Sequence, residues 1–182
     1  MPHLQVVSIR HEDEKEMHRR LVELMPALRA FARSFHRDLS DADDLVQETL
    51  TKAIAKSSQF RPGTNLKSWL FTIMRNSFYN TIRVTSRERP GLLRCVEDER
   101  SEPSGQEWSL RASEMQRMIH RLPADQREAL ILIAVLGVSY EEAAEVASVP
   151  VGTIKSRLNR ARHGLLVLLE ADSPQSLFDN AG

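Results

Sequence analysis

The 182-residue sequence is poor in several features, and each shortage excludes a class of protein. Its single cysteine, Cys95, excludes an internal disulfide framework and a cysteine-based metal cluster. The longest apolar run, residues 129–138, has ten residues including Gly137 and is too short to cross a bilayer. No apolar segment follows Met1, and we therefore expect a protein without a secretory signal that resides in the cytoplasm.

A net charge is also absent, because 25 Lys and Arg residues balance 25 Asp and Glu residues, so only the distribution of charge can indicate a partner. Aromatic residues make up 5% of the chain, and a core built mainly from aliphatic side chains favours helices. The six histidines are scattered without metal-ligand spacing, no glycine-rich phosphate loop occurs, and no nucleophile has an obvious base beside it. We therefore expect neither an enzyme nor a protein that needs a metal or another cofactor.

Helical periodicity occupies two separate parts of the chain. In the first part, Pro26 is placed to start one helix, and Ser40 is placed to cap the next. Thr64 or Asn65 can cap a long helix from about residue 65 to 83, after a proline–glycine turn. The i, i+3, i+4 pattern of the helix after Ser40 predicts a buried stripe of Ala42, Leu45, Val46, Thr49, Leu50, Ala53 and Ile54. The pattern of the long helix predicts a buried stripe of Leu66, Trp69, Leu70, Ile73, Met74, Ser77, Phe78 and Ile82.

The second helical part breaks at Leu122–Pro123 and at Gly137, and it resumes at Ser139. Between the two parts, residues 87–109 lose periodicity and are dense in Pro, Gly, Ser and charges of both signs, as expected of a flexible linker. We therefore predict an all-α protein with two small helical domains. Their bounds are residues 14–86 and 110–170, with tails at 1–13 and 171–182.

The stretch from Ser139 to Glu170 has the spacing of a helix-turn-helix. A capping box between Ser139 and Glu142 starts a helix of about eight residues, an elbow follows at residues 148–150, and a second helix starts near Val151. The inward side of this second helix is predicted to carry Ile154, Leu158, Ala161 and Leu165. Its other sides carry small residues and donors suited to base edges and phosphates: Gly152, Thr153, Lys155, Ser156, Arg157, Asn159, Arg160 and Arg162. We predict that it binds duplex DNA; the alternative is a solvated basic face.

A second basic surface belongs to the long helix of the first part. Residues 61–89 contain six basic residues and one acid, with aromatic and amide side chains between them. Such a surface suits single-stranded or locally opened nucleic acid. The alternative is that Phe71 and Tyr79 complete the core. The candidate residues are Arg61, Lys67, Phe71, Arg75, Asn76, Tyr79, Asn80 and Arg83.

An acidic surface is predicted on the helix that follows Ser40. Asp41, Asp44 and Glu48 share its exposed side, and Asp43 and Gln47 lie next to them. Acids in a first turn are favoured by the helix dipole, but Glu48 is a turn further on. A face that DNA repels is suited to docking on a basic protein partner.

Three stretches resemble, in order and spacing, conserved regions two and four of the extracytoplasmic-function sigma factors of bacterial RNA polymerase. They are "DADDLVQETLTKAI", "FRPGTNLKSWLFTIMRNSFYNTIR" and "LPADQREALILIAVLGVSYEEAAEVASVPVGTIKSRLNRAR". The run "FRPGTNLKSWLFTIMRN" is most similar to the general-stress-response subgroup. The resemblance implies a transcription factor without covalent chemistry, which carries core polymerase to a promoter class and helps to open the DNA there.

The resemblance also implies a role for each candidate surface. Asp41, Asp44, Gln47 and Glu48 would dock on the clamp helices of the polymerase β′ subunit, and the second domain would meet the β flap. The melted −10 element, with one flipped base, would be read by residues 60–68 and by Asn76, Tyr79, Asn80 and Arg83. The duplex −35 element would be read by Lys155, Ser156, Arg157, Asn159 and Arg160. A small anti-sigma protein would hold the factor inactive until a response regulator bearing a sigma-like domain draws that protein away.

Two alternatives use the same sequence features in other ways. A sigma-like decoy would bind an anti-sigma partner without promoter activity, although the basic face at residues 151–163 argues against it. A polymerase-independent repressor would use the helix-turn-helix alone and leave the acidic and aromatic faces of the first domain without a role.

Overall fold

The computed structural model of the protein describes residues 15–61, 63–88 and 107–171, and within these ranges its regular structure is helical. The first domain consists of a helix at residues 15–23, α2 (Met25–Ala32), α3 (Leu39–Ala55), a short 3-10 helix η1 (Ser57–Gln59) and α4 (Leu66–Glu88). The second consists of α5 (Glu107–Arg121), α6 (Ala124–Leu130), the π-helical turn η3 (Ile131–Val135), α7 (Tyr140–Ala147) and α8 (Val151–Ala171). The all-α prediction is confirmed, and most of the predicted linker lies outside the described residues.

The helix starts follow local capping chemistry, with one correction. Pro26 lies in the first turn of α2 as predicted. The cap of α3 is Asp38, whose carboxylate accepts the backbone N–H groups of Ser40 at 2.7 Å and Asp41 at 3.2 Å, so the prediction that Ser40 is the cap was wrong. Asn65 caps α4, because its Oδ1 accepts the backbone N–H of Lys67 at 3.0 Å.

The core of the first domain is an aromatic and aliphatic cluster between α2, α3 and α4. Phe31 is fully buried, and its ring centroid lies 4.9 Å from that of Phe35 and 4.7 Å from that of Phe71. The predicted stripe of α3 is buried apart from Leu50, which is half-buried, and Ile54, which is 48% exposed. Ile54 lies in the last turn of α3, where the chain turns into η1 and no helix covers it.

The helix-turn-helix forms as the sequence predicts. The capping box is complete: the Ser139 hydroxyl accepts the Glu142 N–H, and the Glu142 carboxylate accepts the Ser139 N–H. The elbow turns at Ser148, which adopts the left-handed conformation with φ of 54°. On α8, the inward residues Ile154, Leu158 and Ala161 are 1%, 2% and 0% exposed, and Leu165 is half-buried against the same core as Leu158 and Ala161.

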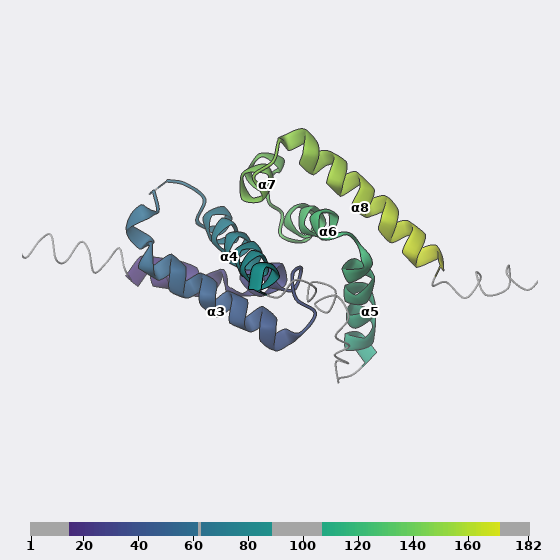
Figure 1. Cartoon of the computed structure of the whole chain (residues 1–182), viewed down its shortest axis with the longest axis horizontal. Helices are drawn as coiled ribbons and strands as arrows, with labels where there is room; N and C mark the ends of the chain where they lie inside the picture. Colours follow the sequence, from purple (N-terminus) through teal and green to yellow (C-terminus); the bar gives the residue numbers. More distant parts are fainter. Residues whose placement is uncertain (1–14, 62, 89–106, 172–182) are drawn as a thin grey trace, which may run out of the picture.

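The two domains pack against each other along α4. Figure 1 shows α3 and α4 on one side of the molecule and α5 to α8 on the other, with α4 beside α6 and α7. One buried cluster continues across the boundary, from Leu70 and Met74 of α4 to Leu132, Ala143 and Val146 of the second domain. The second domain therefore covers the side of α4 that faces away from α3.

None of the helices in the described part of the chain combines the length and the apolar composition that crossing a bilayer requires.

A buried histidine lies where α5 meets the first domain. His120 is 8% exposed, and its Nε2 has no hydrogen-bond partner. The pKa of His120 is lowered to about 4, mainly by burial and in addition by the charges of Arg127, Arg37 and His36, while a hydrogen bond with the Arg33 backbone opposes this shift. The imidazole is therefore neutral at pH 7.

We expect the free energy of unfolding to fall by about 2 kcal/mol through His120 as the pH drops from 6.5 toward 4, because the unfolded chain binds this proton first. This stabilisation is fully present above pH 6.5. Urea unfolding of the wild type and of His120→Gln, followed by circular dichroism at pH 7 and pH 4.5, measures it. The free-energy difference between the two proteins should shrink at pH 4.5, and a difference independent of pH would contradict the expectation.

Candidate nucleic-acid and polymerase interfaces

The outward face of α8 presents most of the predicted duplex-binding residues to solvent. Lys155, Ser156, Asn159, Arg160 and Arg162 are exposed, while Thr153 is half-buried. Gly152 is exposed at the start of the helix, and a Cβ there would meet no atom of the chain within 4 Å. The protein's own packing therefore does not require a glycine at this position, and the space is open to a ligand.

Contacts along α8 orient part of this face. The Lys155 ammonium lies 5.6 Å from the centre of the Tyr140 ring on α7, and the Arg160 guanidinium donates to the Ser156 carbonyl at 3.3 Å. Arg157 differs from the prediction: its side chain is 18% exposed and pairs with Asp125 of α6 at 3.1 Å. Its position on the flank of α8 points it toward α6, so Arg157 holds the domain together instead of extending the exposed basic face.

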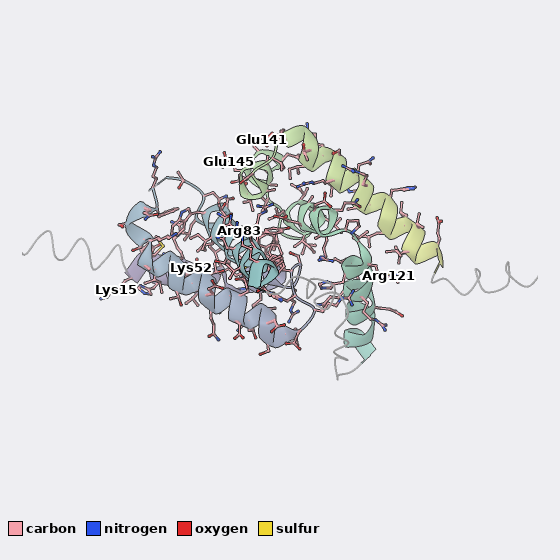
Figure 2. The ribbon with its side chains drawn as sticks, in the orientation of Figure 1. Lys15, Lys52, Arg83, Arg121, Glu141 and Glu145 are labelled. Carbon is pink, nitrogen blue, oxygen red and sulfur yellow. The ribbon has the colours of Figure 1, made fainter. Side chains whose placement is uncertain are left out.

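The predicted single-strand surface of α4 is divided by the packing of the two domains. Arg61, Asn76, Asn80 and Arg83 are exposed, and Figure 2 labels Arg83 on this helix. The Asn80 Oδ1 accepts a hydrogen bond from the Arg83 guanidinium at 3.3 Å, which leaves the Asn80 amide N–H₂ directed to other acceptors.

Phe71 was predicted on the exposed side of α4, and this prediction was wrong. The ring is 0% exposed and packs on Phe31, while the Lys67 ammonium lies 5.9 Å from its centre. α4 is covered by α3 on one side and by the second domain on the other, so its buried face is wider than one stripe. Phe71 therefore belongs to the core in this arrangement, which is the alternative that the sequence left open for it.

Three further candidates on α4 are covered by the second domain. The Arg75 Nε donates to Glu128 Oε1 of α6 at 2.6 Å, and the guanidinium lies 4.6 Å from the centre of the Tyr79 ring. The Lys67 ammonium donates to the backbone carbonyl of Leu136. Lys67, Arg75 and Tyr79 are all half-buried, so they are not open to nucleic acid in this arrangement.

Sequence reasoning missed the residues of the second domain that make these contacts. Glu128 is 2% exposed, and the Glu142 Oε1 accepts a hydrogen bond from Asn65 Nδ2 at 2.5 Å. In the opposite direction, Arg127 Nε donates to the Ser34 carbonyl at 2.5 Å. One signal was available for Glu128: it precedes Leu132 by four residues and so lies on the buried stripe of an apolar helix, which requires a buried partner.

Arg75, Glu128 and Tyr79 form a cluster of titratable side chains that is largely shielded from solvent. Burial raises the pKa of the Glu128 carboxyl, and the charge of Arg75 and its hydrogen bond oppose that rise. Burial also raises the pKa of the Tyr79 phenol, with a further contribution from the nearby Glu128 charge. The second oxygen of Glu128, Oε2, has no hydrogen-bond partner.

The acidic face of α3 is open to solvent over most of its length. Asp41, Asp44 and Gln47 are exposed, while Glu48 is half-buried and pairs with Lys52 at 2.5 Å. The exposed Asp43 next to them pairs with Arg29 at 3.2 Å. The face is thus formed mainly by the first two turns of α3.

Comparisons with known proteins agree with this architecture. Residues 21–88 match the family described as Sigma-70 region 2, and residues 112–163 match the family described as Sigma-70, region 4. The ECF RNA polymerase sigma factor EcfG of Rhodopseudomonas palustris is 46% identical over 159 residues, which cover 83% of each chain. The ECF RNA polymerase sigma factor SigC of Mycobacterium tuberculosis is 40% identical over 140 residues, which cover 74% of each chain.

One similar solved structure is the sigma factor RpoE in complex with the anti-sigma factor NepR, from Bartonella quintana. It matches this chain with a TM-score of 0.77 at 44% identity, over 87% of this chain and 99% of the matched one.

Proposed function

Because this chain belongs to the extracytoplasmic-function family of RNA polymerase sigma factors, we propose that three of its surfaces divide the work of promoter recognition. A sigma factor is a non-enzymatic initiation factor that directs core RNA polymerase to promoters. The observation that carries the proposal is the exposed donor face of α8 on a complete helix-turn-helix.

The first surface is this outward face of α8, which reads the duplex −35 element. Lys155 and Arg160 match the acceptor edge of guanine, and Asn159 matches adenine. Arg162 and the helix N-terminus suit phosphates, and the open space at Gly152 allows the DNA backbone to approach closely. Arg157 is left out of this surface because it pairs with Asp125.

The second surface is the face of α4 with the preceding loop, which reads the melted −10 element. Arg61, Asn76, Asn80 and Arg83 are accessible as the chain stands, and Lys67, Arg75 and Tyr79 join them once the second domain moves away. Opening DNA costs about 1.4 kcal/mol per base-pair step, whereas one captured base contributes about 1–3 kcal/mol. Two or three captured bases, with polymerase contacts, therefore offset the opening of a few pairs.

The third surface is the acidic face of α3, which docks on a basic surface of core polymerase, the clamp helices of β′. Asp41, Asp44 and Gln47 provide its exposed groups, and Glu48 adds a carboxylate shared with Lys52. The β flap is the proposed contact of the second domain. The acids of α3 repel DNA, so the acidic face binds polymerase and the two basic faces bind DNA without competing for the same partner.

A small anti-sigma protein is the proposed inhibitor of this chain, in a general stress response. The support is the similarity to EcfG and to RpoE, which was solved in complex with the anti-sigma factor NepR. An inhibitor of this kind acts by holding the polymerase-binding and DNA-binding faces out of reach.

Run-off transcription with purified core polymerase tests the proposal. Family membership favours a transcript that depends on this chain, whereas a decoy or a polymerase-independent repressor yields none. Mapping the transcript starts also supplies the promoter sequence without a prior guess.

We expect Asn80→Ala to slow promoter opening more than closed-complex formation, because the Asn80 amide is proposed to hydrogen-bond with unpaired bases and not with duplex DNA. Loss of one base contact corresponds to about 1–3 kcal/mol. Permanganate reactivity of the melted thymines measures opening, and Thr85→Ala, an exposed position later on the same helix, is the control. Equal reactivity of the Asn80→Ala and wild-type complexes would remove Asn80 from this role.

A further inference from the structure

The buried carboxylate of Glu128 has its ion-pair partner in the other domain. Arg75 lies 53 residues earlier in the chain, and the two side chains are 18% and 2% exposed. A buried charge is costly unless it is paired, so each of these groups depends on the other while the domains are together. The charge of Arg157 in the same domain and the Tyr79 side chain also favour the charged form of Glu128, but the ion pair itself is made with Arg75 across the boundary.

Arg75 is also preorganised to bind an anion. Its guanidinium lies over the Tyr79 ring, an arrangement that fixes the plane of the donor groups beside an aromatic face. A guanidinium binds carboxylate and phosphate oxygens through the same forked donor geometry. Glu128 therefore places on Arg75 the type of acceptor that a nucleic-acid phosphate would place there.

Two neighbouring groups at the start of α4 are engaged in the same way. Lys67 donates to the Leu136 carbonyl, and Asn65 donates to the Glu142 carboxylate, so the second domain supplies only acceptors to these three donors. Two of the three acceptors are anionic. The contact between Arg127 and Ser34 runs in the opposite sense, but Ser34 lies after α2 and not on this face.

We propose that the second domain, through Glu128, is an internal competitor of single-stranded promoter DNA, so that the free chain is closed without any partner protein. The carboxylate occupies Arg75 until nucleic acid or polymerase separates the domains. This inference rests on the proposed role of the α4 face in binding the −10 strand.

The test compares binding of a fluorescein-labelled single-stranded oligonucleotide, carrying the non-template −10 sequence of a mapped promoter, to the free full-length chain. Glu128→Gln keeps the shape and removes the charge, and Glu128→Ala removes the acceptor. At fixed salt, both should bind about tenfold tighter than the wild type, since losing a charge-assisted bond shifts the population toward the open form. The control is Glu145→Gln, an exposed carboxylate of α7 that is labelled in Figure 2, and it should bind like the wild type.

A second measurement reports the domains directly. Cys95→Ser removes the single cysteine of the chain, and Ser57→Cys and His163→Cys then introduce one labelling site in each domain, both at exposed positions. The distance between the two spin labels is the inter-domain distance. Both Glu128 variants should lengthen that distance in the absence of DNA. Circular dichroism should show the wild-type helix content for each, so that a gain in binding is not a consequence of unfolding.

The possible outcomes separate the two proposals. If the Glu128 variants bind no tighter, or if the distance is unchanged, the competition by Glu128 is overturned, while the role of α4 in the holoenzyme is unaffected. If the variants open and bind more tightly, adding Asn80→Ala should remove most of the gain. A gain that Asn80→Ala and Arg75→Ala leave intact would overturn both proposals, because the oligonucleotide would then bind elsewhere.

Discussion

Asp44→Arg combined with Glu48→Arg should abolish association with core RNA polymerase and leave no transcript above the level of core enzyme alone. The double substitution replaces two carboxylates of the docking face by two cations, which a basic partner repels. Like charges across an interface cost several kcal/mol of binding free energy, about 3 kcal/mol or more for these two positions together. Co-elution with core enzyme in size-exclusion chromatography and run-off transcription both measure the loss.

The fold should survive this change. Asp44 is exposed, and the pair of Glu48 with Lys52 is 42% exposed at both side chains, so its loss costs about 1 kcal/mol or less. Glu16→Arg with Glu23→Arg introduces the same change of charge at two exposed positions of the helix at residues 15–23, which belongs to none of the proposed interfaces, and it should co-elute with core enzyme. Normal co-elution of the α3 variant would show that this face is not the docking surface.

Lys155→Ala combined with Arg160→Ala should remove recognition of the −35 element. Each lost base contact costs about 1–3 kcal/mol, so the double variant should lose about 2–6 kcal/mol of specific binding. The measurement is footprinting of the holoenzyme on promoter DNA with the wild-type and with a scrambled −35 element. The variant should bind the two DNAs with similar affinity, because it loses discrimination.

Arg157→Ala is a matched control on the same helix. The sequence places Arg157 in the DNA-binding set, whereas the structure pairs it with Asp125, so its loss should lower the stability of the α6–α8 contact and leave base discrimination unchanged. Unaltered footprints of the Lys155 and Arg160 double variant, or a loss of discrimination in Arg157→Ala equal to theirs, would contradict the assignment of the outward face.

The sequence predicts well those features that are decided within one or two turns. The capping box of Ser139 and Glu142, the elbow before Val151 and the inward residues of α8 depend on neighbours a few positions away, and all are as predicted. The cap of α3 was assigned to Ser40 because its side chain is a good cap, but Asp38 equally satisfies the rule and is placed where the chain is still extended.

The contacts between domains could not be predicted in the same way. Phe71 was misplaced because a helical stripe identifies one buried face, whereas α4 is covered on two sides. Arg75 pairs with a residue 53 positions away and Asn65 with one 77 positions away, and no local spacing relates them. Of the predicted single-strand surface, the exposed Asn76, Asn80 and Arg83 follow from helix periodicity alone.

The hydrogen bond between Asn65 and Glu142 joins the first turns of α4 and α7, and each residue uses a different atom for each task. Asn65 caps α4 with Oδ1 and reaches across with Nδ2, while Glu142 closes its capping box with Oε2 and accepts with Oε1. Breaking this bridge therefore unwinds neither helix. In the proposed opening of the chain, α4 and α7 therefore each keep their own cap, and neither helix start has to refold before it engages a promoter.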